Sequence, residues 1–446
     1  MKLFVAVSAL VIIFATAAEA QNWQRLINAE TFGLCINPLR SSTVYVGGLG
    51  RRLYRSYDAG KTWDTLVVEF TTATTRFTNV YVSPADTNVI MVAGLGFGSV
   101  RRSADHGQTW DIVIETLSPF TAPSETILND PHNPDIVYTA DLRYCNIYRS
   151  YDRGVTWDTI GSAGIPFDEN LCTLAIRRDS SNIIVAGMIG GAIKISADSG
   201  KTWKFANQLP ISADDSEVSQ IVFSKRDPLV GYAAITYFYY LNRPNGGIFR
   251  TKDGGYSWER IGFADTSFWT VAARVRNGED DVFAGGYTED YGAPLRVPGY
   301  GIVKHTTDGG TTWIDAGQNI PWPDSIRRNA WMIKFAGEND ELVYMATERG
   351  FYLLDESAQS ANENTTVEEI ITSLADKKLR VSAASQLQIS GEITLSSLLG
   401  AVVARRRIET NDNSETFDFS ELPAGVYIVS VNLGGKRQFG TVVMLD

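Results

Sequence analysis

The octapeptide SYDAGKTW, residues 56–63, decides the fold because it recurs five more times along the chain. The other copies read SADHGQTW at 103–110, SYDRGVTW at 150–157, SADSGKTW at 196–203, TKDGGYSW at 251–258 and TTDGGTTW at 306–313. All six fit the pattern S/T-x-D-x-G-x-T/S-W. Their aspartates stand at positions 58, 105, 152, 198, 253 and 308, at a period close to 50 residues that signals a propeller or a solenoid.

The composition of the octapeptide predicts a tight turn between two strands. Short Asp and Ser/Thr side chains hydrogen-bond to nearby backbone N–H groups, and glycine supplies the positive φ that such a turn needs. Strand-like residues precede the first copy at 53–55 and follow it at 63–66. We therefore expect a hairpin turn between the third and fourth strands of each repeat. We expect a structural and not a catalytic role for the six aspartates: Asp58, Asp105, Asp152, Asp198, Asp253 and Asp308.

The other two strands of each repeat are also visible. A first strand ends in a polar turn such as Asn37-Pro38, and a second, apolar strand such as residues 44–46 follows. Four short strands in each repeat are typical of a propeller blade. A seventh repeat lacks the octapeptide but has strand-like residues at 331–335, 342–345 and 350–354.

The missing fourth strand of the seventh repeat is predicted at residues 23–26, Trp-Gln-Arg-Leu, which resemble the strands that follow the octapeptides. The two ends of the repeat array would then close one blade together and leave no exposed sheet edge. The sequence thus predicts an all-β protein with a seven-bladed β-propeller at residues 21–354.

The N-terminus has the pattern of a signal peptide at residues 1–20. Lys2 gives the positive start, residues 3–14 are largely apolar, and Ala18-Glu19-Ala20 forms a small-x-small cleavage site. No later stretch approaches the roughly 18 consecutive apolar residues of a transmembrane helix. We therefore expect an exported protein without a transmembrane segment, secreted or held at the outer surface of a Gram-negative bacterium.

The C-terminal region divides into a linker and a small domain. Residues 355–378 are polar and acidic and lack aromatic residues, which is typical of a linker. Alternating apolar and polar residues return at 391–395, 415–419 and 426–431, and a final strand is expected at 440–445. Residues 379–446 are therefore predicted to form a small antiparallel β-sandwich.

The overall composition excludes some classes of partner. The net charge of -11 argues against nucleic acid, whose phosphates require a Lys/Arg surface. Neither the three histidines nor the three cysteines show metal-ligand spacing, so no metal and no cofactor are expected. We expect Cys35, Cys145 and Cys172 to be buried as small apolar side chains, with a Cys145–Cys172 bridge left open.

The fifth and sixth repeats are longer than the others and predict a ligand site. Their extra residues fall between the second and third strands, on the rim opposite the octapeptide turns. Loops on a rigid scaffold carry binding residues, and Tyr and Trp suit sugar rings or protein ligands. The candidate residues are Tyr237, Tyr239, Tyr240, Tyr287, Glu289, Asp290, Tyr291 and Trp322. The alternative is that these aromatic residues pack the long loops against each other.

Two functions remain open on this evidence. The lack of a recognisable catalytic set favours a binding protein with a glycan or protein ligand at the upper rim. If the chain is an enzyme, Glu289 or Asp290 could pair with a second acid, as glycoside hydrolysis requires. Acidic residues on an exposed loop are more often simply solvated, and this is the alternative.

The octapeptides resemble the Asp-box (BNR) repeat of sialidases, xyloglucan-cleaving hydrolases, sortilin-type receptors and photosystem II assembly factors. The resemblance implies the propeller fold and does not choose among these functions. Sialidases carry an Arg-Ile-Pro motif that this sequence lacks. Xyloglucanases generally have two propellers, whereas this chain has room for one.

The last 65 or so residues resemble the C-terminal sorting domain of type IX secretion substrates. The resemblance rests on LPAGVYIV at 422–429, which follows Leu398-Leu399-Gly400. Such domains often open with Tyr-Pro-Asn-Pro, where this chain has VSAAS at 381–385. The resemblance implies that the secretion machinery is a partner of this domain. An accessory β-domain is the alternative.

Overall fold

The computed structural model describes most of the chain between residues 22 and 357. The ranges are 22–69, 76–95, 98–116, 118, 124–164, 169–211, 216–237, 245–288, 301–323 and 328–357. The structure also describes residues 15–16 and the following parts of the C-terminal region: 371–375, 378–382, 389–397, 402–410, 414–418, 421, 423, 425–433 and 436–444. The chain forms two compact units, Gln21–Glu356 and a second that comprises Met1–Ala20 and Ser357–Asp446.

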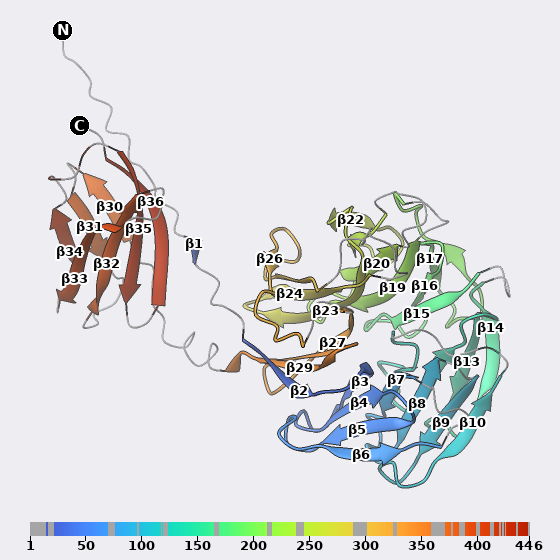
Figure 1. Ribbon diagram of the computed structural model, residues 1–446. Helices are drawn as coiled ribbons and strands as arrows, with labels where there is room; N and C mark the ends of the chain where they lie inside the picture. The colour runs from blue at the N-terminus through green and yellow to red at the C-terminus, as the bar shows by residue number, and fades with distance from the viewer. Residues whose placement is uncertain are drawn as a thin grey trace. The chain divides into compact units, whose positions relative to one another are not determined.

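The first unit is a propeller of seven four-stranded antiparallel sheets (Figure 1). Blade 1 consists of β3 (Thr31–Ile36), β4 (Val44–Gly48), β5 (Arg52–Ser56) and β6 (Asp64–Val67). Blade 2 consists of β7 (Arg76–Val82), β8 (Ile90–Leu95), β9 (Ser99–Ser103) and β10 (Asp111–Glu115). Blade 3 consists of β11 (Leu128–Asn129), β12 (Val137–Ala140), β13 (Asn146–Ser150) and β14 (Asp158–Ser162).

The remaining blades follow the same order. Blade 4 consists of β15 (Leu171–Ile176), β16 (Ile184–Met188), β17 (Ile193–Ser196) and β18 (Lys204–Phe205). Blade 5 consists of β19 (Ser216–Phe223), β20 (Gly231–Tyr237), β21 (Gly247–Thr251) and β22 (Glu259–Gly262). Blade 6 consists of β23 (Phe268–Arg276), β24 (Glu279–Gly286), β25 (Val303–Thr306) and β26 (Ile314–Asp315). Blade 7 consists of β27 (Ala330–Ala336), β28 (Leu342–Thr347), β29 (Gly350–Asp355) and β2 (Trp23–Ile27). The predicted seven-bladed propeller is confirmed.

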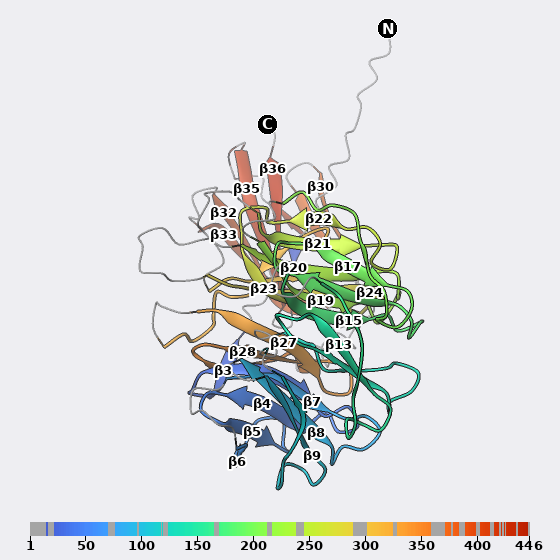
Figure 2. The same ribbon diagram turned by 90° about the vertical axis from the view of Figure 1, so that its right-hand side faces the viewer.

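The hydrophobic core lies between neighbouring blades. The first strand of each blade is the innermost, and Figures 1 and 2 show the sheets following one another around a common axis. Val44 and Val46 of blade 1 pack in one cluster with Met332, Tyr344 and Phe351 of blade 7. All five side chains are buried. Each sheet thus obtains its buried surface from the sheets on either side.

The octapeptide turns owe their shape to two short polar side chains. In the first copy, Ser56 Oγ accepts from Gly60 N at 2.8 Å and donates to Asp58 Oδ1 at 2.8 Å. The other oxygen, Asp58 Oδ2, accepts from Thr62 Oγ1 at 2.7 Å. The Trp63 indole N–H closes the turn by donating to Gly60 O at 2.9 Å. The same serine or threonine, aspartate and tryptophan bonds recur in the other five copies.

Each octapeptide turn is also a docking point for the preceding blade. A Cβ on Gly60 would lie 2.6 Å from Leu26 Cδ1 of blade 7, so only glycine leaves room for that leucine. Gly60 also has a φ of 89°, in the left-handed region that favours glycine. Arginines of the preceding blade donate to turn carbonyls, as Arg55 Nη1 does to His106 O at 2.7 Å. The octapeptides therefore join blades as well as strands.

Strand β2 closes the ring. It pairs antiparallel with β29, with Trp23 opposite Leu354 and Arg25 opposite Tyr352. Trp23 is buried, and its indole N–H donates to Ala316 O of blade 6 at 2.9 Å. The seventh blade is therefore built from both ends of the propeller sequence, as the sequence predicts.

The seventh blade has no octapeptide. A buried ionic cluster instead holds the residue that follows its strand β29. Arg274 of blade 6 is fully buried, and its Nη2 lies 2.5 Å from Glu356 Oε2 and 3.2 Å from Asp281 Oδ2. Arg276 adds a contact of 3.0 Å to Glu356, and His305 Nε2 lies 3.0 Å from Asp281 Oδ1. Burial raises the pKa of Asp281, but His305 and Arg274 outweigh it and hold that pKa below its usual value. The cluster fastens Glu356, just after the last propeller strand, to blade 6.

The second unit contains two antiparallel sheets. One has the order β1-β36-β35-β32-β33, from Ala15–Thr16, Lys436–Met444, Gly425–Leu433, Ile389–Ser397 and Val402–Thr410. The other has the order β30-β31-β34, from Ile371–Ala375, Lys378–Ser382 and Ser414–Asp418. Strand β1 falls within the predicted signal peptide. The sandwich, the signal peptide and the boundaries at 354 and 378 remain predictions.

The three cysteines are free in the structure. Cys145 and Cys172 are buried and not bonded to each other, whereas Cys35 is only half-buried and so departs from the expectation that all three are buried. Burial raises the pKa of the Cys145 thiol to about 12 and that of Cys35 to about 11. Both thiols are therefore poor nucleophiles at neutral pH.

Deleting residues 21–28 should strongly destabilise the propeller, because it removes β2 and leaves β29 and the core beneath Trp23 exposed. Loss of a buried Trp side chain alone typically costs about 3–5 kcal/mol. Differential scanning calorimetry should show a large fall in melting temperature or aggregation. An equal deletion at 358–365, in the predicted linker, is the control. Equal tolerance of both deletions would contradict closure by β2.

The octapeptide aspartates should make the protein acid-sensitive. Hydrogen bonds from the turn threonines lower the pKa of Asp58, Asp105 and Asp198 from 3.8 to about 2. A carboxylate with a lowered folded pKa stabilises the fold above pH 3.8, and this contribution disappears as the pH falls to about 2. Urea unfolding across that range should show a smaller pH dependence for Asp58→Asn than for the native chain. Asp111→Asn, just outside a turn, is the matched control, and an identical effect of both changes would sink the assignment.

Candidate functional site

The topology separates the predicted site residues from the octapeptides. The octapeptide turns lie at one end of each blade. The loops between second and third strands and the connections between blades lie at the other end, here called the upper face. Tyr237 ends β20, Tyr287 follows β24, and Trp322 lies between β26 and β27, all on the upper face. Tyr239, Tyr240, Glu289, Asp290 and Tyr291 lie outside the described residues.

Tyr237 and Tyr287 meet at the connection between blades 5 and 6. The backbone N–H of Tyr237 donates to Ser267 Oγ at 3.3 Å, and that of Tyr287 donates to Ser267 O at 3.1 Å. The Tyr237 hydroxyl donates to Asp265 O at 2.9 Å. Both tyrosines are 8% exposed. In the described structure, these two residues pack this connection and offer little surface to a ligand.

Tyr287 belongs to a buried aromatic cluster that sequence reasoning missed. Its ring centroid lies 4.7 Å from that of Trp269 and 5.4 Å from that of Trp331, and Trp331 lies 6.2 Å from Phe32. Trp269 and Trp331 each stand at a β-bulge, where the register with the second strand shifts. The cluster therefore fills the upper end of the first strands of blades 6, 7 and 1.

Trp322 lines a cavity of about 400 Å³ on the upper face. The cavity lies at the connection from the fourth strand of blade 6 to the first strand of blade 7, and such a connection is here called the outlet of the blade that it leaves. The indole is half-buried and lies 5.4 Å from the Tyr352 ring, which holds it in place. Gln318, Asp315 and Arg328 line the same cavity. Gln318 and Asp315 are exposed, so the cavity combines one aromatic ring with a carboxamide, a carboxylate and a guanidinium.

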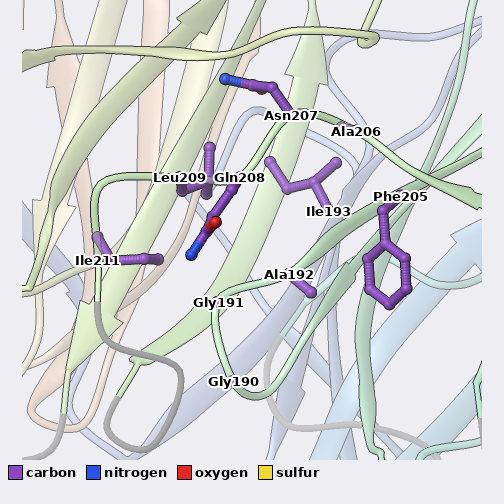
Figure 3. Close-up of a pocket in the computed structure, with 10 residues that line it drawn as sticks. All are labelled: Gly190, Gly191, Ala192, Ile193, Phe205, Ala206, Asn207, Gln208, Leu209 and Ile211. Carbon is purple, nitrogen blue, oxygen red and sulfur yellow. The ribbon is translucent and has the colours of Figure 1, made fainter.

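A second cavity, of about 250 Å³, lies at the outlet of blade 4 (Figure 3). Phe205, which is 66% exposed, forms one side of it, and Ile211 lies at another. Figure 3 shows the Gln208 side chain between Ile211 and the turn at residues 190–192. No residue of this cavity was predicted from the sequence, because its loops are short.

Charged residues near the propeller axis have structural partners. Lys334 of blade 7 forms an ion pair with Glu125 of blade 3, although these blades are not neighbours. Ser124 Oγ donates to Ser219 O of blade 5 at 2.7 Å. Both contacts tie separated blades together. Among the described residues, no group of three His, Cys, Asp or Glu side chains could hold a metal ion.

The C-terminal residues match a known family. Residues 375–444 fit the model of the secretion system C-terminal sorting domain. The chain is therefore an exported β-propeller protein that carries a type IX secretion sorting domain, secreted or held at the outer surface of a Gram-negative bacterium. No helix within the described ranges is long and apolar enough to cross a membrane.

Solved structures share the fold with this chain. A YCF48 protein bound to a D1 peptide has a TM-score of 0.51 and 16% identity, with 79% of this chain and 98% of that chain covered. A GH74 enzyme from Niastella koreensis has a TM-score of 0.56 and 16% identity, with 95% and 66% covered. The GH74 xyloglucanase from Xanthomonas campestris has a TM-score of 0.56 and 14% identity, with 96% and 76% covered. No curated protein sequence matches.

Deleting residues 379–446 should trap the protein inside the cell envelope. All but the first four residues of the matched sorting domain, 375–444, lie in this segment, whereas all seven blades lie before it. Fractionation and immunoblotting should find the truncated chain in the periplasm, folded and resistant to protease. Normal amounts at the cell surface or in the medium would contradict a sorting role for this segment.

Proposed function

We propose that this exported propeller is a binding protein whose ligand is a glycan held in the cavity around Trp322. The observation that supports the proposal is the combination of side chains in that cavity. A half-buried indole, the exposed Gln318 carboxamide, and the charged Asp315 and Arg328 all line it. A sugar ring has an apolar face for an indole and hydroxyl groups for these polar side chains.

The cavity is fixed by the scaffold, which favours binding. Trp322 N donates to Ile320 O at 2.8 Å, and the buried Ile320 anchors this connection in the core between blades 6 and 7. The Trp322 ring rests on Tyr352 of β29. Because these groups are positioned before a ligand arrives, little conformational freedom is lost on binding.

A glycoside hydrolase is the second candidate, because two of the similar solved structures are GH74 enzymes. Hydrolysis generally needs two carboxyl groups on either side of the scissile bond. Asp315 is the one carboxylate among the described residues of this cavity, and it lies 3.8 Å from Lys304 Nζ. Glu289 and Asp290 are the further acids that a hydrolase would need to bring to this rim.

Glycan-array binding of the purified chain, next to Trp322→Ala and Gln318→Ala, tests the proposal. Each change should weaken binding of a recognised glycan about tenfold or more, which corresponds to about 1.4 kcal/mol or more of lost binding free energy. Tyr151→Ala is the matched control, because Tyr151 is a 55% exposed aromatic residue beside an octapeptide aspartate, at the opposite end of the blades. Binding of peptides or proteins and of no glycan would overturn the proposed ligand class.

A hydrolysis assay on the same glycans separates the two functions. A binding protein should release no reducing sugar from plant or sialylated polysaccharides. Robust turnover that Glu289→Gln or Asp290→Asn abolishes would establish the hydrolase and contradict the binding protein.

A further inference from the structure

The outlets of blades 4 and 6 share a sequence pattern. Residues 206–211 read ANQLPI and residues 316–322 read AGQNIPW, so both have alanine, a glutamine two positions later, and then Leu or Ile followed by proline. The third strands of the same blades also begin alike, with GAIK at 191–194 and GIVK at 301–304. These are the segments that line the two cavities of the upper face.

The backbone of the two outlets is held in the same way. In blade 4, Ala206 N donates to Ile193 O at 2.9 Å, and in blade 6, Ala316 N donates to Val303 O at 2.8 Å. Each loop then makes the same tight turn, from Ile211 N to Leu209 O and from Trp322 N to Ile320 O, both at 2.8 Å. The two cavities are therefore copies of one structural element, two blades apart on the same face.

Both copies offer an aromatic ring and a free carboxamide. Phe205 supplies the ring in blade 4 and Trp322 supplies it in blade 6. Gln208 and Gln318 occupy equivalent positions and are exposed, and neither side chain has a hydrogen-bond partner within the described part of the chain. Since the fold makes no use of these two carboxamides, they are available to a ligand.

The blade 4 cavity is kept open by its glycine turn. A Cβ on Gly191 would lie 2.3 Å from Ile211 Cδ1, so a side chain there would collide with the cavity wall. Lys194 Nζ lies 4.7 Å from the centroid of the Phe205 ring and 2.7 Å from Glu169 Oε2. This lysine covers one face of the ring and leaves the ring 66% exposed.

We propose that the blade 4 cavity is a second glycan subsite and that one extended polysaccharide chain contacts both cavities. The inference rests on the proposed function of the Trp322 cavity. The volume of about 400 Å³ lies at the low end of the roughly 300–1,000 Å³ of small-molecule sites and that of about 250 Å³ lies below it, so each cavity holds a short portion of a ligand. Two linked weak contacts can raise the overall affinity by about 10²–10⁴.

A polysaccharide fits the two cavities better than a peptide does. Each cavity has one aromatic ring and a carboxamide at the same place, as a polymer of sugar rings and hydroxyl groups requires, although the ring comes from a different position in each. The ring of blade 4, Phe205, stands where blade 6 has Asp315, and the ring of blade 6, Trp322, stands where blade 4 has Ile211. A repeating, hydroxyl-rich ligand needs only one ring to stack on and one carboxamide to bond to at each place.

The test compares polymers with short oligosaccharides. The probes are soluble xylan, mannan and mixed-linkage β-glucan in affinity electrophoresis, and the trisaccharides of the same polymers in titration calorimetry. The variants are Phe205→Ala, Gln208→Ala, Trp322→Ala and the double variant Phe205→Ala/Trp322→Ala, with Tyr151→Ala as control. Phe205 and Gln208 are exposed, so unchanged melting temperatures should accompany their replacement.

The native chain should bind one of the three polymers, and Phe205→Ala or Trp322→Ala should each weaken that binding at least tenfold. The double variant should lose it. The matching trisaccharide should bind with a stoichiometry of two in the native chain and one in Phe205→Ala. A stoichiometry of one, lost in Trp322→Ala and unaffected by Phe205→Ala, would overturn the second subsite and leave the proposed function standing. Binding of none of the polymers would overturn the contact of one polysaccharide with both cavities, and binding of no glycan on the array as well would overturn the proposed function too.

Discussion

Each propeller blade has two apolar faces, and only its two neighbours can bury them. The central strands show this constraint most clearly, since Tyr45 and Val46 of blade 1 are fully buried although their sheet is only four strands wide. A row of such sheets would leave two faces in water at its ends. Bending the row into a ring removes both ends, which makes β2 as necessary as any strand of the other blades.

Because neighbouring blades must pack against each other, the sequence can vary less on the octapeptide face of the ring than on the upper face. On the face of the octapeptides, each turn is fixed by its own aspartate and also receives the preceding blade, as Gly60 receives Leu26. A change there disturbs two blades. On the upper face, the connections are not held by a repeated turn, so they differ in length and side chains. The cavities of blades 4 and 6 arise where two of these connections kept one pattern.

Much of the architecture could be predicted from sequence because the octapeptide is held by local hydrogen bonds. Its Ser, Asp and Gly lie within five residues of one another, so the pattern alone defines the turn. The site was harder to predict because its contacts are distant in sequence. Tyr287 reads as an exposed loop residue, yet Trp269 and Trp331 bury it through bulges that no local pattern indicates. The repeated outlets at 206–211 and 316–322 are visible in the sequence, but only comparison outside the octapeptides finds them.

Closure by β2 also constrains the order in which the propeller can fold. The strand is synthesised before any of the blades and is used after all of them, since Trp23 bonds to Ala316, 293 residues later. Contacts so distant in sequence form slowly, because a long chain must first be brought together. Until β29 has been made, no order of blade assembly can complete the ring. The ring therefore stays open until the last strand of the propeller, β29, has been synthesised.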